Sequence, residues 1–289
     1  MSVYDVHGNT LQNAFDVSGQ ELDVAYDVDG SVVYQAVEPT DPYIDGRTLI
    51  WEDDFNGNSL NTENWRCELG DVRSAELQTY RAENVEVKNG CLEITAKRED
   101  FGTKHWTSGS ITTSTKKVFT YGRLEAKIKF PNVVGAFGAF WTIIENRLLE
   151  YHETGPATIT ILGQPEYAEI DMTETIPGNA STAQANLWKT SGGYESLGAG
   201  RSSPIVSSDW NIYACEWTSE YIAISVNGTE FKRYTFADYD YADIEGYHFP
   251  HYIYLNLAVG SAGGTPAAST NEMKMYVDWV RVYAPLNGT

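Results

Sequence analysis

The chain has 289 residues, which is enough for one large all-β domain or for one domain with a small appendage. Its formal charge is −20, from 40 acidic and 20 basic residues. A field of that sign repels nucleic acid and anionic membrane surfaces, so neither is an expected partner, whereas a neutral ligand is not opposed.

The cysteines and the apolar segments exclude further classes. Cys67, Cys91 and Cys215 are odd in number and lack the spacing of metal ligands, so no disulfide framework and no zinc site is expected. The sequence contains no run of about 18 apolar residues, so no transmembrane helix is expected. The start, MSVYDVHGNT, lacks the basic and apolar regions of a signal peptide. Either a leader has been removed from this chain or export takes another route.

The first 35 residues contain three short repeats, YDVHGNTL (4–11), FDVSGQEL (15–22) and YDVDGSVV (26–33), spaced by 11 residues. Each glycine suits a turn between short strands, but three such units cannot bury a core alone. We therefore interpret 1–35 as a small β-repeat module for self-association or attachment to a larger particle; the alternative is an ordered decoration. Residues 36–47 contain two prolines and read as a linker.

Residues 48–289 read as strands almost throughout. The segments 84–96 and 222–234 each place Asn-Gly between alternating apolar residues, which is a strong hairpin signal. Segment 121–130 alternates strictly between polar and apolar side chains. Many strands with turn punctuation predict an all-β fold, a two-sheet antiparallel β-sandwich of jelly-roll type.

The segment YAEIDMTETI (167–176) places three carboxylates in a β-like run. Side chains alternate along a strand, so Glu169 and Asp171 share one face, whereas Glu174 would point to the other. One β-bulge between Asp171 and Glu174 would return Glu174 to the same face.

Three carboxylates on one surface repel one another unless some are protonated or hydrogen-bonded. Glycosidases need such a set, because one carboxylate attacks the anomeric carbon and a protonated second one donates to the leaving oxygen. The alternatives are a solvated charged edge, since an E-x-D-x-x-E pattern arises by chance in acidic chains, and calcium binding, although a strand cannot wrap an ion as a loop does.

Beyond this motif, AEIDMTE resembles the signature of glycoside hydrolase family 16, in its bulged form. The resemblance covers residues 48–284. Within the family, the chain looks most similar to laminarinase-type endo-β-glucanases. Further blocks occur in the family's order: LIWEDDFNGNSLNTENWRCELG, AELQTYRAENVEVKNGCLEITAKRE, WTSGSITTSTKKVFTYGRLEAKIKFP, FGAFWTI, YLNLAVGSAGGTP and MYVDWVRVYAP. The resemblance implies the β-sandwich fold with a concave glycan-binding cleft.

The resemblance also implies the catalytic roles. Glu169 would be the nucleophile, Glu174 the general acid/base, and Asp171 the partner between them. Retaining enzymes hold the two working carboxyls about 5–5.5 Å apart. Asp171 would share a proton with Glu169 and so determine which acid stays neutral.

Six further residues are assigned to the substrate cleft. One precedes the nucleophile on the same face, two lie on the following strand, and three come from other strands: Tyr167, Asn186, Trp188, Trp141, Arg123 and Asn256. For Arg123 and Asn256 the alternative is a structural ion pair or a backbone hydrogen bond. The chain departs from laminarinases at Phe137 and Gln164, where tryptophan is usual, and at Ala75, where asparagine is usual. These departures affect the expected glucan specificity more than the hydrolytic machinery.

Many family members carry a structural calcium away from the cleft. The matching positions are Asp54, Gly90 through its carbonyl, and Asp278, an oxygen-only set that suits Ca²⁺. The alternative is two surface aspartates and a turn glycine. No catalytic cofactor is expected.

The sequence thus predicts an extracellular retaining endo-β-glycosidase that cleaves a neutral β-linked polysaccharide, β-1,3- or mixed-linkage β-glucan. A second reading within the enzyme class is an endo-β-galactosidase acting on galactan or mucin-type glycan. A reading from another class is a non-catalytic lectin-like module that uses the same cleft; such a module should lack one of the acids, and this chain keeps all three.

Overall fold

The computed structural model describes residues 46–176, 182–191 and 195–286 in full, together with the backbone of six short strands near the start of the chain. The chain divides into two compact units, residues 1–45 and 46–289. In the first unit, β1 pairs with β2, β3 with β4 and β5 with β6, so that one antiparallel hairpin crosses each repeat. These strands are Val3–Tyr4, Thr10–Leu11, Ala14–Phe15, Glu21–Leu22, Val24–Tyr26 and Val32–Gln35. The linker predicted at 36–47 lies almost wholly outside the described residues.

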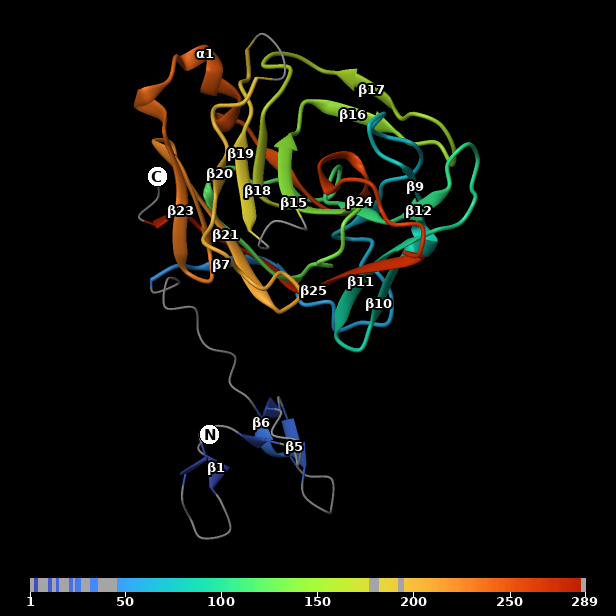
Figure 1. Ribbon diagram of the computed structural model, residues 1–289. Coiled ribbons are helices and arrows are strands. Elements are labelled where there is room, and N and C mark those ends of the chain that lie inside the picture. Colours follow the sequence, from blue (N-terminus) through green and yellow to red (C-terminus); the bar gives the residue numbers. More distant parts are fainter. Residues whose placement is uncertain are drawn as a thin grey trace. The chain divides into compact units, whose positions relative to one another are not determined.

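The second unit contains two large sheets (Figure 1). In the larger sheet the strand order is β23-β22-β21-β14-β25-β11-β12-β9, with β10 beside β11 and β7 beside β25. All its pairs are antiparallel except β12 with β9. Its strands are β7 (Leu49–Asp53), β9 (Gln78–Tyr80), β10 (Val85–Lys88), β11 (Cys91–Lys97), β12 (Trp106–Ser108), β14 (Gly122–Lys129), β21 (Asn211–Trp217), β22 (Tyr221–Val226), β23 (Thr229–Thr235) and β25 (Glu272–Tyr283).

The smaller sheet has the order β20-β19-β18-β15-β24-β13-β8 and is antiparallel throughout. Its strands are β8 (Arg66–Cys67), β13 (Ser110–Thr112), β15 (Ala136–Ile144), β18 (Glu169–Thr175), β19 (Ala183–Leu187), β20 (Gly200–Arg201) and β24 (His251–Val259). A separate hairpin joins β15 to β18 and consists of β16 (Arg147–Glu150) and β17 (Thr158–Ile161).

Helical structure in the described part of the chain is limited to short segments. They are α1 (Tyr241–Ile244) and the 3₁₀ turns η1 (Ala82–Asn84), η2 (Phe236–Asp238), η3 (Glu245–His248) and η4 (Ser261–Gly263). None of these is long or apolar enough to cross a membrane. The predicted two-sheet antiparallel β-sandwich is confirmed.

Both predicted Asn-Gly hairpins are present. Asn89 and Gly90 have φ values of 52° and 74° between β10 and β11, and Asn227 and Gly228 have φ values of 48° and 75° between β22 and β23. Positive φ at both central residues defines the type I′ turn, whose twist matches the twist of the flanking strands.

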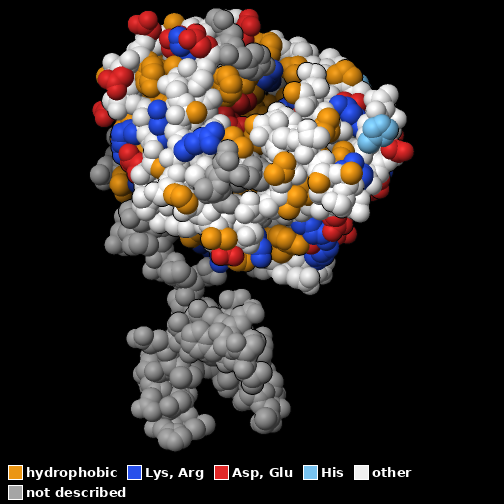
Figure 2. Space-filling model, viewed as in Figure 1, with side chains coloured by type: hydrophobic (Ala, Val, Ile, Leu, Met, Phe, Trp, Pro, Cys, Tyr) orange, Lys and Arg blue, Asp and Glu red, His pale blue; other side chains and the backbone are white. Residues whose placement is uncertain are grey.

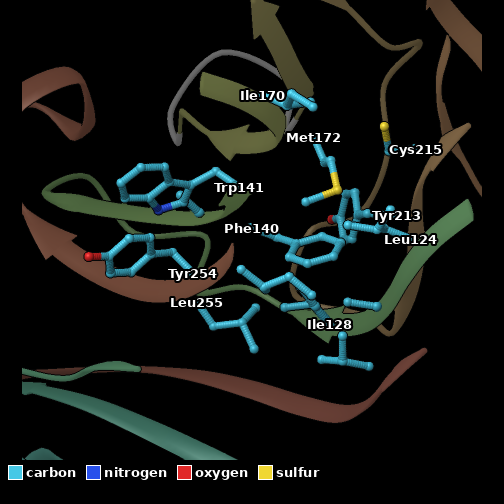
Figure 3. Packing of buried hydrophobic residues seen from close by; sticks show 14 of the residues in the cluster. Leu124, Ile128, Phe140, Trp141, Ile170, Met172, Tyr213, Cys215, Tyr254 and Leu255 are labelled. Carbon is cyan, nitrogen blue, oxygen red and sulfur yellow. The ribbon is translucent and has the colours of Figure 1, made fainter. Parts of the chain in front are cut away.

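The core lies between the two sheets. Along β14 the apolar set Leu124, Ala126 and Ile128 is buried, as the alternation predicts. Figure 3 shows that side chains of this strand meet Phe140 of β15 and Met172 of β18, which come from the smaller sheet. This packing fixes the inner face of β18, so its other face is left for the acids.

Candidate active site

The three acids of β18 lie on one face because the strand carries a bulge. Trp141 of β15 lies opposite Asp171, but the preceding Phe140 lies opposite Thr173, so one residue of β18 is extra. The pairing of β18 with β19 also shifts between Asp171 and Glu174. The predicted bulge is therefore present, and Met172 can stay in the core while Glu174 joins the other two acids.

Glu169, Asp171 and Glu174 all line one cavity of about 330 Å³ on the outer side of the smaller sheet. Its walls come from β15, β18 and β24, from the segment between β8 and β9, and from the β16–β17 hairpin. Figure 2 shows acidic side chains at the bottom of a hollow that hydrophobic side chains border.

Each carboxyl has its own hydrogen-bond donor. The Tyr167 hydroxyl donates to Oε2 of Glu169 over 2.6 Å. The indole Nε1 of Trp188 donates to Oδ2 of Asp171 over 2.9 Å, and Nε2 of Gln184 donates to Oε2 of Glu174 over 3.4 Å. The donors come from β18's own N-terminal approach and from the neighbouring β19 segment, so the orientation of the acids depends on both.

Burial raises the pKa of all three carboxyls, but the neighbouring groups change the size of this effect differently for each one. The pKa of Glu174 rises to about 7 through burial and the charge of Glu169. Burial and the charges of Glu169 and Glu174 raise the pKa of Asp171 well above its ordinary value. Burial also raises the pKa of Glu169, whereas hydrogen bonds from Tyr167 and Asp171 and two arginines oppose the rise. The proton shared by Glu169 and Asp171 therefore stays on Asp171, and Glu169 ionises first.

Four of the six residues assigned to the substrate cleft line this cavity: Tyr167, Trp188, Trp141 and Asn256. Trp141 stacks on Tyr254 with ring centroids 4.3 Å apart and planes 10° apart, and its Nε1 donates to Oδ1 of Asn256 over 2.8 Å. Both rings line the cavity, although Tyr254 is only 1% and Trp141 only 8% exposed; aromatic rings of this kind are those on which apolar sugar faces pack.

The other two assigned residues lie elsewhere. Asn186 lies opposite Asp171 on β19, but it is buried and accepts a hydrogen bond from Ser196 Oγ over 2.5 Å. Arg123 is not brought to the cavity, because β14 belongs to the larger sheet. Its Nε donates to Glu125 over 2.5 Å, the ion pair that was the structural alternative for this residue.

The cavity also contains residues that the sequence analysis did not select: Arg73, Glu76, Arg147, Tyr252 and Tyr254. The two tyrosines alternate with Asn256 along β24, so a period of two could have found them. Arg73 lies outside the regular strands and Arg147 lies on the additional hairpin, and no periodicity marks either of them.

The residues predicted to hold calcium lie near one another but already have partners. Asp54 accepts from Nδ2 of Asn56 over 2.6 Å, and a Cβ on Gly90 would lie 3.6 Å from Oδ1 of that asparagine. Asp278 forms an ion pair with Lys127 over 2.9 Å. Throughout the described ranges, no three His, Cys, Asp or Glu side chains gather as a metal site would need. The predicted set fits calcium only in part, because Lys127 already supplies positive charge to one ligand.

Comparisons with known proteins agree with this geometry. Residues 51–285 match the family model described as the GH16 domain of β-porphyranases A–D. The chain is 31% identical over 280 residues to the glucan endo-1,3-β-glucosidase A1 of Niallia circulans, across 85% of this chain. It is 28% identical over 255 residues to the keratan-sulfate endo-1,4-β-galactosidase of Sphingobacterium multivorum, across 81% of this chain. The laminarinase structure from Flavobacterium sp. UMI-01 superposes with a TM-score of 0.70 and 30% identity, over 82% of this chain and all of that one.

The chain spans 39% of the length of the Niallia relative and 54% of the length of the Sphingobacterium relative. The family model covers nearly all of the β-sandwich, including the bulged strand and its three acids. The chain therefore belongs to glycoside hydrolase family 16.

Proposed function

We propose that this protein is a retaining endo-β-glycosidase that cleaves internal linkages of β-1,3- or mixed-linkage β-glucan. The observation that carries the proposal is the common face of Glu169, Asp171 and Glu174, which the bulge creates inside one cavity. The glucanase and laminarinase relatives support the choice of glucan.

The three acids divide the chemistry by their protonation. Glu169 ionises first and attacks the anomeric carbon, while Glu174, with a pKa of about 7, carries the proton that the leaving oxygen needs. After the covalent glycosyl-enzyme has formed, the ionised Glu174 takes a proton from the water that hydrolyses it. Asp171 keeps the proton shared with Glu169 and thereby keeps the nucleophile charged.

The aromatic surface next to the acids supports a sugar substrate. Trp141, Tyr254 and Trp188 line the cavity that the acids line, so rings of the glycan chain can pack beside the scissile bond. Such packing orients the linkage without charge, which agrees with a neutral polysaccharide.

Product analysis on a panel of glycans tests the proposal. Laminarin and mixed-linkage glucan should be cut to short oligosaccharides, with a rapid fall in chain length that marks endo-action. Glu169→Ala measured beside the wild type shows whether the cleavage belongs to this site. Wild-type protein that is folded yet releases nothing from any glycan, while still binding one, would leave the lectin-like reading in place.

A second candidate is an endo-β-galactosidase acting on galactan or mucin-type glycan. The matching family model is that of the GH16 domain of β-porphyranases A–D, and one relative is a keratan-sulfate endo-1,4-β-galactosidase. Phe137, which stands where laminarinases usually have tryptophan, lines the cavity. Galactans, keratan-type chains and mucin glycans therefore belong in the same panel, and the substrate with the highest kcat/KM decides between the two candidates.

The proposal extends to the remaining features of the chain. We place a structural calcium near Asp54, Gly90 and Asp278, away from the cavity. We also assign residues 1–35 to self-association or attachment, and the enzyme to the outside of the cell, where polysaccharide is found. Removal of residues 1–45 should change the mass measured by light scattering and leave kcat/KM per chain nearly unchanged; an unchanged mass argues against self-association.

A further inference from the structure

The β16–β17 hairpin brings an arginine to the cavity. Arg147 lies opposite Ile161 and Leu149 lies opposite Ile159 in this two-stranded ladder. Arg147 and Leu149 are two residues apart, so they share one face of β16, and both line the cavity that contains the acids. The hairpin therefore supplies one wall of the site, with a cation on it.

Among the residues that the structure describes, no carboxylate forms an ion pair with Arg147. Its Nε is buried without a hydrogen-bond partner, and in the described part of the chain its guanidinium forms no ion pair. Arg73, the other arginine of the cavity, differs: its two terminal nitrogens lie 3.0 and 3.3 Å from the carboxylate oxygens of Glu68, and Glu76 lies 3.9 Å away. Of these two arginines, Arg147 has the less compensated charge.

The contact that Arg147 does make leads to the nucleophile. Its guanidinium carbon lies 5.4 Å from the centre of the Tyr167 ring, within the range of a cation–π interaction. The Tyr167 hydroxyl in turn donates to Oε2 of Glu169 over 2.6 Å. A positive charge over the ring draws electron density from the phenol, so its O–H becomes a stronger donor to the carboxylate.

We propose that Arg147 is a positioning residue that acts through Tyr167 to keep the Glu169 carboxylate ionised and oriented for attack. This inference rests on the proposed function, because it takes Glu169 as the nucleophile. It adds to that function a residue on a hairpin outside the two sheets, and it gives a role to a cation that pairs with none of the acids described.

Other groups around Glu169 act on its charge by other routes. On its own strand, the charges of Glu169 and Glu174 repel each other, whereas the hydrogen bond from Asp171 lowers the pKa of Glu169 and assists its ionisation. Arg73, from the segment between β8 and β9, is bound by Glu68. The Tyr247 hydroxyl of η3 donates to the backbone carbonyls of Glu169 and Trp188, and the Trp188 indole donates to Asp171. The hydrogen bond from Tyr167 and the charges of Arg73 and Arg147 all oppose the effect of burial on the pKa of Glu169, so Arg147 adds to the effect of Arg73.

The test compares Arg147→Gln and Arg147→Lys with a matched control, Arg233→Gln. Arg233 also lies over a tyrosine ring, 4.2 Å from the centre of Tyr221, but on the edge strand β23 of the larger sheet. Arg147→Gln should lower kcat/KM on the order of tenfold, mainly through kcat, as expected for a weakened hydrogen bond to a charged group. The acidic limb of its pH profile should move to higher pH. Arg147→Lys should keep the limb near that of the wild type, and Arg233→Gln should match the wild type throughout.

Tyr167→Phe separates action through Tyr167 from direct action. If Arg147 acts through the hydroxyl, then Arg147→Gln should have a much smaller effect in the Tyr167→Phe background than in the wild type. An equal effect in both backgrounds, or an unmoved acidic limb in folded Arg147→Gln, overturns the inference. Either result leaves the proposed function intact, whereas a wild type that cleaves no glycan overturns the proposed function itself. Circular dichroism and the melting temperature of each variant show that the comparison is between folded proteins.

Discussion

The indole Nε1 of Trp188 donates a hydrogen bond of 2.9 Å to Oδ2 of Asp171, so a residue just after β19 holds the middle carboxyl of β18. This bond crosses the sheet at the point where the pairing of β18 and β19 shifts. The bulge brings the acids to one face, and Trp188 then fixes the orientation of the central one. The geometry of the face that carries the three acids therefore depends on two strands.

Trp188→Phe keeps an aromatic ring and removes this donor. A hydrogen bond to a neutral buried carboxyl contributes roughly 0.5–1.5 kcal/mol, so we expect kcat to fall by about two- to tenfold, with a smaller change in KM because the ring remains. Steady-state kinetics measures both. Trp210→Phe is the control, because Trp210 is 41% exposed and does not line the cavity. Equal kcat values for Trp188→Phe and the wild type would show that this hydrogen bond does not orient Asp171 for the reaction.

The pH profile should show the proton of Glu174. Its pKa is raised to about 7 by burial and by the charge of Glu169, so the acid is protonated below that pH and loses its proton above it. We expect kcat/KM to decline as the pH rises through about 7. Glu174→Gln cannot ionise, so its residual activity should lack this basic limb.

The raised pKa of Glu174 also makes the stability of the folded protein depend on pH. Because the pKa of Glu174 is higher in the folded than in the unfolded protein, its contribution is fully present below the ordinary carboxyl pKa of 4.5 and is lost as the pH rises through about 7. Between these values Glu174→Gln should therefore become less destabilising relative to the wild type. Urea unfolding at several pH values measures the difference; a difference that grows with pH would contradict the raised pKa.

The core between the sheets should be sensitive to volume. Phe140 is fully buried and packs between the sheets, so Phe140→Ala should cost about 3–5 kcal/mol of the free energy of unfolding. For a domain of this size the melting temperature should fall by roughly 10 °C. Leu148→Ala is the matched control, because Leu148 is 51% exposed on the additional hairpin, and its effect should stay within about 0.5 kcal/mol.

The strands and turns could be predicted because their signals are local. The Asn-Gly pairs specify type I′ turns, and the alternation along β14 identifies the apolar face that packs in the core, although Arg123 and Glu125 of its polar face are buried as well. Local signals do not tell which sheet a strand joins. The alternation correctly puts Arg123 on the polar face of its strand, but that strand belongs to the larger sheet, away from the cavity.

The common face of the acids could be predicted for the same reason. Glu169 and Asp171 are two residues apart, whereas Asp171 and Glu174 are three apart, so a bulge is needed to bring all three to one face. Arg73 and Arg147 could not be predicted, because they reach the cavity from a loop and from a hairpin whose positions depend on the packing of the whole unit. Tyr254 lies between these cases: its parity with Asn256 was readable, but its stacking on Trp141 depends on the pairing of β24 with β15.

Calcium, if it binds at the proposed place, should stabilise the folded protein by mass action. Chelation of metal-loaded protein should then lower the melting temperature, while activity well below that temperature should stay nearly constant because the cavity is remote. Asp54→Asn should reduce the effect of the chelator. A melting temperature that does not respond, in protein shown beforehand to contain calcium, contradicts a stabilising site at these residues.

The two glutamates of the bulged strand should be separable by azide. Glu174→Ala lacks the acid and later base, so it should lose about 10²–10⁴-fold on a natural glycan and less on an activated aryl glycoside, whose leaving group needs little protonation. Azide should intercept its covalent intermediate and give a β-glycosyl azide, the product of two inversions. With Glu169→Ala, azide should attack directly and give the α-azide. Asp171→Asn should be slower with unchanged stereochemistry. If NMR shows that the wild type first releases the α-anomer, the enzyme inverts and Glu169 is not its nucleophile.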